Sequence, residues 1–251
     1  MGVSELFWNA SLEELKRGYI QKSEYYQCIL CGEKFEIGVI YPSEGVLYEA
    51  ERFTRIHIVK EHRSVFEYLI QLDKKLTGLT DHQNKLINLF FQGKSDAEVQ
   101  EDMGIGSAST IRNHRFTLKE KERQSKVFLT LMELLKEKDK HAPAFLDVHQ
   151  TARMVDERYN VTEDEKEEVL KKYFPQGIDG PLKTFKLKEK HKVIVLREIT
   201  KRLNPNEKYS EKEINEILKM VYQDYVQIRR YLIEYGFLDR KMDGSVYWLK
   251  K

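Results

Sequence analysis

Four residues near the amino terminus have the side chains and the spacing of a metal site. Cys28 and Cys31, the two cysteines of the chain, are separated by two residues, and His57 and His62 follow further along. Thiolate sulfur and imidazole nitrogen are the ligands that zinc takes in tetrahedral structural sites. We therefore predict a zinc ion held by these four residues. Because four protein ligands leave no position for a reactive water, the predicted zinc is structural and no catalytic residue is assigned.

The elements that must position these ligands are a hairpin and a helix. Alternating apolar residues predict a hairpin over residues 35–48, with its first strand over 35–41. Apolar residues then recur at helical spacing, which predicts one long helix over residues 50–76. His57 and His62 lie about 500° apart on an ideal helix, so we expect the helix to loosen between them.

The order of cysteines, hairpin, helix and histidines resembles a Cys2His2 zinc finger with its ββα arrangement. Twenty-five residues separate Cys31 from His57, whereas that finger has about 12–15 residues in this interval. The hairpin is therefore expected to be enlarged, and the base contacts of zinc fingers are not carried over. The alternative is a CxxC thiol pair with two unrelated histidines on the surface. A Cys28/His57 nucleophile pair is a weaker alternative than zinc.

Three helix signals follow one another in the middle of the chain. Thr80–Gln83 and Ser95–Glu98 each have the pattern of a capping box, and a third helix is expected after a glycine-bearing turn at 103–107. The segment 79–121 resembles the LuxR/GerE helix-turn-helix family. The shared features are an opening Leu-Thr, a Gly-x-Ser before the second helix, and Thr-Ile-x-x-His on the third. The segment departs from that pattern by one extra residue in the turn and by Phe116.

This resemblance implies binding to double-stranded DNA, with the helix 108–121 in the major groove. Arg112 and Asn113 would reach base edges, because arginine pairs with guanine and asparagine with adenine. The residues suited to phosphate contacts are Ser107, Ser109, Thr110, Arg115 and Lys119. Ile111 and Leu118 would anchor the helix to the core. The alternative is an ordinary three-helix core with a basic outer face.

The carboxyl-terminal part resembles a bacterial domain family of unknown function that often occurs behind helix-turn-helix segments. The resemblance covers most of residues 170–251 and implies an association with transcription regulators. The segments that carry it are Tyr173–Pro175, Leu182–Phe185, Lys188–Lys192, Tyr209–Asn215 and Arg229–Leu238.

The same part has the element order of a winged helix. Helical periods predict three helices, and Asp243-Gly244 predicts the turn of a hairpin after them. Arg229 and Arg230 are expected to be exposed on the third helix, and Lys241 to lie on the wing. These three residues are candidates for a second DNA contact. A module for packing or dimerisation is the equal alternative, since a fold does not decide a function.

The composition is that of a folded and highly charged protein. The 251 residues include 43 Lys+Arg and 41 Asp+Glu, with 41% hydrophobic and 33% charged residues. Basic residues concentrate in 107–126 and 183–202, and acidic residues in 156–172. Such blocks suit a nucleic-acid binder, although solvated helix faces give the same pattern. No apolar run is long enough for a membrane span, and Met1–Glu5 lacks the pattern of a secretory signal, so a cytoplasmic location is expected.

The predicted fold is mainly α with small β-hairpins, an α+β class, in four consecutive segments. These are a zinc-binding module at 1–76, a LuxR-like helix-turn-helix with an extended helix at 77–140, a linker and acidic helix at 141–172, and a winged-helix-like domain at 173–251.

These features predict a bacterial transcription regulator that binds DNA sequence-specifically and performs no chemical step. The chain lacks Gly-x-Ser-x-Gly, Walker A, Gly-x-Gly-x-x-Gly and His-Glu-x-x-His motifs, so neither an enzyme nor a small-molecule substrate is predicted. A homodimer would extend the few bases that one short recognition helix reads. The alternative function is a zinc-containing adaptor that binds proteins or RNA without sequence-specific DNA readout.

Overall fold

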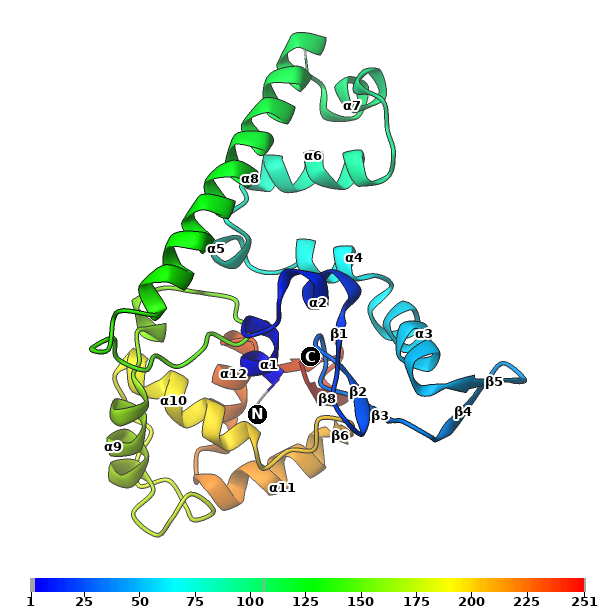
Figure 1. Ribbon diagram of the computed structural model, residues 1–251. Coiled ribbons are helices and arrows are strands. Elements are labelled where there is room, and N and C mark those ends of the chain that lie inside the picture. The colour runs from blue at the N-terminus through cyan, green and yellow to red at the C-terminus, as the bar shows by residue number, and fades with distance from the viewer. Residues whose placement is uncertain (1–2, 106, 251) are drawn as a thin grey trace. The chain divides into compact units, whose positions relative to one another are not determined.

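The chain forms two compact units (Figure 1). The computed structural model describes residues 3–105 and 107–250, so Gly106 of the expected turn, the ends Met1-Gly2 and residue 251 lie outside the described residues. The larger unit consists of residues 1–76 and 145–251, and the central unit consists of residues 77–144. Segments expected as separate domains at the two ends of the chain are therefore parts of one unit.

The amino-terminal part of the larger unit contains short helices and two antiparallel sheets. The helices are α1 (Val3–Trp8) and α2 (Leu12–Arg17). The first sheet has strands hydrogen-bonded in the order β1 (Tyr19–Gln21), β2 (Tyr25–Cys28) and β3 (Lys34–Glu36). The second is a hairpin of β4 (Ile40–Ser43) and β5 (Val46–Glu49).

The single strand predicted over 35–41 is divided between these two sheets. Phe35 lies in β3 opposite Tyr26 of β2, whereas Tyr41 lies in β4 opposite Tyr48 of β5. Gly38 separates them at a φ of 89°, in the left-handed region that favours glycine. The prediction of one enlarged hairpin was therefore wrong, because alternation identifies a strand but not the strand with which it pairs.

The long helix predicted over 50–76 is also divided. Helix α3 (Ala50–His62) ends where Arg63 takes the left-handed φ of 59°. Ser64 then caps α4 (Val65–Ile70) by accepting a hydrogen bond from the Glu67 amide at 3.0 Å, and α5 (Lys74–Thr77) follows. This capping hydroxyl starts a new helix in the middle of a continuous apolar pattern, which the spacing of the apolar residues does not reveal.

The central unit is built on three helices. These are α6 (Asp81–Phe91), α7 (Asp96–Met103) and α8 (Ala108–Lys136). The capping boxes predicted at Thr80 and Ser95 are both formed. A small core of Leu86, Leu89, Val99 and Ile111 joins the three helices. Leu118 lies outside this core.

The carboxyl-terminal part of the larger unit packs helices around a small sheet. A 3-10 turn, η1 (Glu157–Tyr159), precedes α9 (Glu163–Tyr173) and α10 (Glu189–Thr200). Then follow β6 (Lys208–Ser210), α11 (Glu211–Val221), α12 (Tyr225–Glu234), β7 (Leu238–Arg240) and β8 (Val246–Leu249). The strand order is β6-β8-β7, so the predicted hairpin gains a third strand. The buried core includes Leu196, Ile214, Leu232 and Tyr247.

Side chains connect the two parts of the larger unit. The indole nitrogen of Trp8 donates to the Val148 carbonyl at 2.7 Å, and Gln150, 5% exposed, bonds with Ile29 and Tyr68. The fold is thus mixed helix and small antiparallel sheet, as the predicted α+β class requires. Among the described residues, no helix combines the length and the apolar character that a membrane span needs.

Candidate metal centre and candidate nucleic-acid interface

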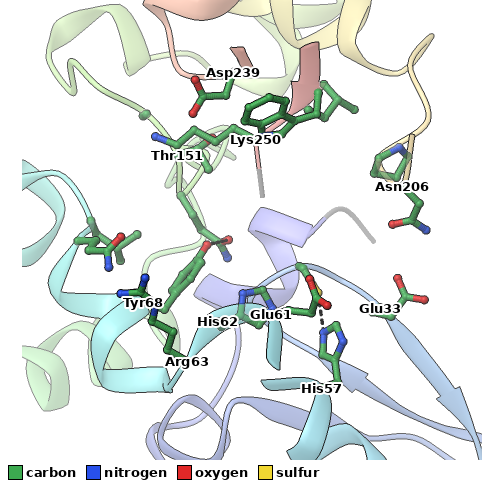
Figure 2. Close-up of a pocket in the computed structure, with 18 of the residues that line it drawn as sticks. Glu33, His57, Glu61, His62, Arg63, Tyr68, Thr151, Asn206, Asp239 and Lys250 are labelled. Carbon is green, nitrogen blue, oxygen red and sulfur yellow. Dashed lines mark hydrogen bonds between the residues drawn. The ribbon is translucent and has the colours of Figure 1, made fainter. Parts of the chain in front are cut away.

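The four predicted metal ligands meet in the larger unit. One ligand atom from each of Cys28, Cys31, His57 and His62 lies within 4.8 Å of the others. The Cys31 sulfur is 3.2 Å from Nε2 of His57, a contact drawn as a dashed line in Figure 2. Two sulfurs and two nitrogens at these separations can surround one metal ion.

Local structure places the two cysteines in a tight turn. Cys28 is the last residue of β2, and its carbonyl accepts a hydrogen bond from the Gly32 amide at 2.8 Å. The Cys28 amide donates to the Glu33 carbonyl at 2.9 Å. Gly32 has a φ of 83°, which a residue with a Cβ atom rarely adopts. The turn thus brings both sulfur atoms to the same side of the chain.

The two histidines come from one helix. α3 remains helical through His62, its last residue, and the imidazole centroids of His57 and His62 are 5.4 Å apart. From their angular separation we expected the helix to loosen between them. This prediction was wrong, because α3 stays helical over both residues. The break comes immediately afterwards, at Arg63.

The burial of the donors fits a metal ligand set. Cys28 is fully buried and Cys31 is 8% exposed. Nε2 of His62 is buried and has no hydrogen-bond partner among the described residues. A buried nitrogen without a partner is costly, and a metal ion would supply the missing interaction.

The cysteine pair is electrostatically uneven. Its hydrogen bond with Cys28 is the main cause that lowers the pKa of the Cys31 thiol, and His57 and His62 add to this effect while burial opposes it. The hydrogen bond with Cys31 and burial raise the pKa of Cys28. In the metal-free pair these shifts favour the thiolate at Cys31 and keep the proton at Cys28. A bound cation would release that proton, since the coordinating form of cysteine is the thiolate.

A cavity of about 1150 Å³ adjoins the cluster (Figure 2). Cys31 lines this cavity, and Figure 2 shows His57 and His62 at one side of it and Asp239 and Lys250 of the carboxyl-terminal part at the other. Carboxylates and cations both line this cavity. The cluster of four possible ligands is therefore open to solvent on one side.

The candidate nucleic-acid interface lies at the start of α8. Arg112 and Asn113 are exposed, and within the described part of the chain neither side chain has a hydrogen-bond or ion-pair partner. Ser109 and Thr110 are exposed beside them, and their hydroxyls both lie within hydrogen-bond distance of Ser107. Ser107 also caps the helix by accepting from the Thr110 amide at 3.4 Å.

Arg115 has an internal partner that the sequence did not indicate. Its guanidinium donates two hydrogen bonds to Oδ1 of Asp96, at 2.9 and 2.7 Å, and lies 3.7 Å from the ring centre of Phe90. It therefore ties α8 to α6 and α7. Lys119, by contrast, makes only an exposed ion pair with Glu122 at 2.7 Å.

His114 lies against a second histidine. Its Nε2 is 3.3 Å from Nε2 of His82, near the start of α6. His114 therefore lies at a contact between α8 and α6.

Of the three residues predicted to make a second DNA contact, two are exposed and one is largely buried. The Arg229 side chain is 13% exposed, pairs with Glu211 at 3.0 Å, bonds with Asn215 and lies over the Tyr247 ring. The prediction that Arg229 is exposed was therefore wrong, because α11 and β8 cover that side of α12. Arg230 and Lys241 are exposed.

Comparison with known proteins identifies only the carboxyl-terminal part. Residues 181–249 match a family described as "Uncharacterized protein conserved in bacteria (DUF2087)". This match confirms the expected resemblance to a bacterial family of unknown function. No curated protein and no solved structure matches the chain.

Proposed function

We propose that this protein is a cytoplasmic bacterial transcription regulator that binds double-stranded DNA through the first half of α8. In this proposal α7 and α8 form a helix-turn-helix, as the resemblance of residues 79–121 to the LuxR/GerE family suggests. The observation that carries the proposal is the pair Arg112 and Asn113 on a helix anchored by Ile111: both are exposed, and their side chains have no hydrogen-bond or ion-pair partner among residues 3–105 and 107–250. An arginine and an asparagine on a major-groove helix can read guanine and adenine.

The charges around α8 favour a polyanion. Beyond Arg115, the helix carries Lys119, Lys121, Arg123 and Lys126 against Glu120 and Glu122, so basic residues outnumber acidic ones there. α7 carries acidic residues, but Arg115 neutralises Asp96, and Lys94 neutralises Asp102. The repulsion that α7 would exert on DNA phosphates is therefore reduced. Phosphate contacts of this kind position a protein on DNA and make its affinity depend on salt.

Zinc is the metal that we propose for the Cys28–Cys31–His57–His62 cluster. Two sulfur and two imidazole donors match its preference, and four protein ligands fit a structural ion. Zinc would hold the turn after β2 against α3. Because the unfolded chain has no preformed site, this binding free energy becomes folding free energy.

The carboxyl-terminal part would act as a winged-helix-like module. The order α10, β6, α11, α12 and then the β7–β8 hairpin supports this interpretation. Arg229 is engaged internally, so a second DNA contact would rest on Arg230 and Lys241 alone. Packing against a partner remains the alternative role of this module.

Binding of a labelled duplex, measured by fluorescence anisotropy across salt concentrations, tests the proposal. We expect affinity to fall linearly with salt on logarithmic axes, and single-stranded RNA to compete less well than duplex DNA. Preference for RNA, or no duplex binding at low salt, would instead favour the adaptor and RNA alternatives.

A further inference from the structure

The second half of α8 carries a large exposed apolar surface. Seven large apolar side chains there are between 37% and 65% exposed. They are Val127, Phe128, Leu129, Leu131, Met132, Leu134 and Leu135. Apolar patches of this density on a folded protein mark interaction sites, because water contact with them is unfavourable.

Most of these side chains share one face of the helix. At 100° per residue, Val127, Phe128, Leu134 and Leu135 all fall within about 60° of Leu131. Leu129 falls on the opposite side, about 160° away. The five residues centred on Leu131 therefore form one stripe, which we call the α8 stripe.

The charges beside the α8 stripe are arranged as a gradient. One flank of the helix carries Arg123 and Lys126 before Thr130, and Glu133 and Glu137 after it. The spacings of three and four residues place all five on the same side of the stripe. The flank is thus basic toward the amino end of the helix and acidic toward its carboxyl end.

This gradient is complementary to a copy of itself in the reverse direction. In an antiparallel pair centred near Leu131, Arg123 of one copy faces Glu137 of the other, whereas Lys126 and Glu133 lie about 140° and 160° from Leu131 and so point away from the contact. A parallel pair would place the same flank of the two copies on opposite sides of the contact, so Arg123 would not meet Glu137. The existing pair of Arg123 with Glu120 is exposed and local, so Arg123 can exchange partners at little cost.

We propose that the α8 stripe binds the α8 stripe of a second copy of this chain in an antiparallel, two-fold symmetric arrangement. Such an isologous contact puts Leu131 near the symmetry axis. A single helix pair is small beside a stable interface of about 800 Å² per partner. The dimer is therefore concentration-dependent. The proposal does not require DNA binding.

Analytical ultracentrifugation of the full-length protein over a range of concentrations tests this interface. Leu131→Glu should raise the dimer dissociation constant at least tenfold, whereas the matched control Leu129→Glu, on the opposite side of the same helix, should leave it nearly unchanged. Both side chains are exposed, so neither substitution should prevent folding. A wild-type chain that stays monomeric, or equal effects of the two substitutions, would overturn the proposal.

A charge exchange tests the direction of pairing. Glu137→Lys should weaken dimerisation, and adding Arg123→Glu in the same chain should restore it. A parallel pair would not respond in this way, because it keeps Arg123 of one copy away from Glu137 of the other. If the stripe is instead covered by the larger unit of its own chain, these variants will not alter the mass of the particle, and the proposal fails.

Discussion

The hydroxyl of Tyr68 donates a hydrogen bond of 2.8 Å to Oε1 of Gln150, and this contact joins the amino-terminal part of the larger unit to its carboxyl-terminal part. The amide of Gln150 donates in turn to the carbonyl of Ile29 at 3.4 Å, and Ile29 lies between the two cysteines. Tyr68 also approaches the Leu30 carbonyl at 3.3 Å. The turn that carries Cys28 and Cys31 is therefore held from behind by a residue more than 100 positions away.

Gln150→Ala should destabilise the larger unit. The substitution leaves the Ile29 carbonyl without its buried partner and the Tyr68 hydroxyl with the longer contact to the Leu30 carbonyl at 3.3 Å, and an unpaired buried group costs about 1–3 kcal/mol. Urea unfolding of the metal-loaded protein measures the loss, and Gln71→Ala, at an exposed glutamine, serves as the control. Equal unfolding free energies for both variants would contradict the role that we assign to Gln150.

Removal of the metal should unfold the amino-terminal part of the larger unit. Cys28→Ser and His62→Gln should each abolish stoichiometric zinc in the purified protein, whereas His141→Gln, at an exposed histidine, should retain it. Hydrogen exchange in β1, β2 and β3 should accelerate when a chelator is added. Unchanged exchange there, with zinc shown to be absent, would mean that metal does not support this fold.

Arg115→Ala should lower the stability of the central unit by about 1 kcal/mol, because an exposed ion pair and a contact with an aromatic ring are lost together. Lys119→Ala removes only an exposed pair, so its unfolding free energy should be nearly that of the wild type. Thermal unfolding of the two variants makes this comparison. An effect of Arg115→Ala on DNA affinity alone, without a change in stability, would show that its phosphate contact matters more than its internal pair.

His149 should make the protein less stable as the pH falls below neutrality. Burial, with the nearby Arg197, lowers the pKa of His149 to about 3, and its ring stacks on Phe237 at 3.9 Å. The unfolded chain binds a proton at this histidine below pH 6.5 and the folded chain does not, so stability declines between about pH 6.5 and 3, by up to about 1.4 kcal/mol per unit.

The variant His149→Gln isolates this effect. Its unfolding free energy should depend less on pH between 6.5 and 5 than that of the wild type. Both proteins keep the four predicted metal ligands. The pH dependence of those ligands therefore cancels when the unfolding free energy of the variant is subtracted from that of the wild type. Parallel curves would show that His149 is not held in its neutral form.

Local patterns predicted the features that depend on neighbouring residues. The caps at Thr80 and Ser95 follow from side chains that bond to an amide three residues away, and the four metal donors follow from residue type and spacing. The divisions at Gly38 and Arg63 were missed, because each lies inside an uninterrupted apolar pattern.

Contacts between distant segments left no signal in the sequence. Gln150 lies in a stretch that reads as a linker, and the chain brings it to Ile29 only in the folded state. Arg229 was expected to be exposed because it lies opposite an apolar stripe, but Glu211 and Tyr247 meet it from other elements. Helical periodicity identifies the buried face of a helix, but not what covers its remaining faces.

Selection from a random pool of duplex DNA at physiological salt, with wild-type, Arg112→Ala and Lys119→Ala proteins, tests the central claim most directly. We expect the wild type to enrich a defined motif, Arg112→Ala to lose preference at one base position, and Lys119→Ala to keep the motif with weaker binding to all sequences. No enriched motif with the wild type, or the same sequence-independent loss from both substitutions, would contradict base readout by α8.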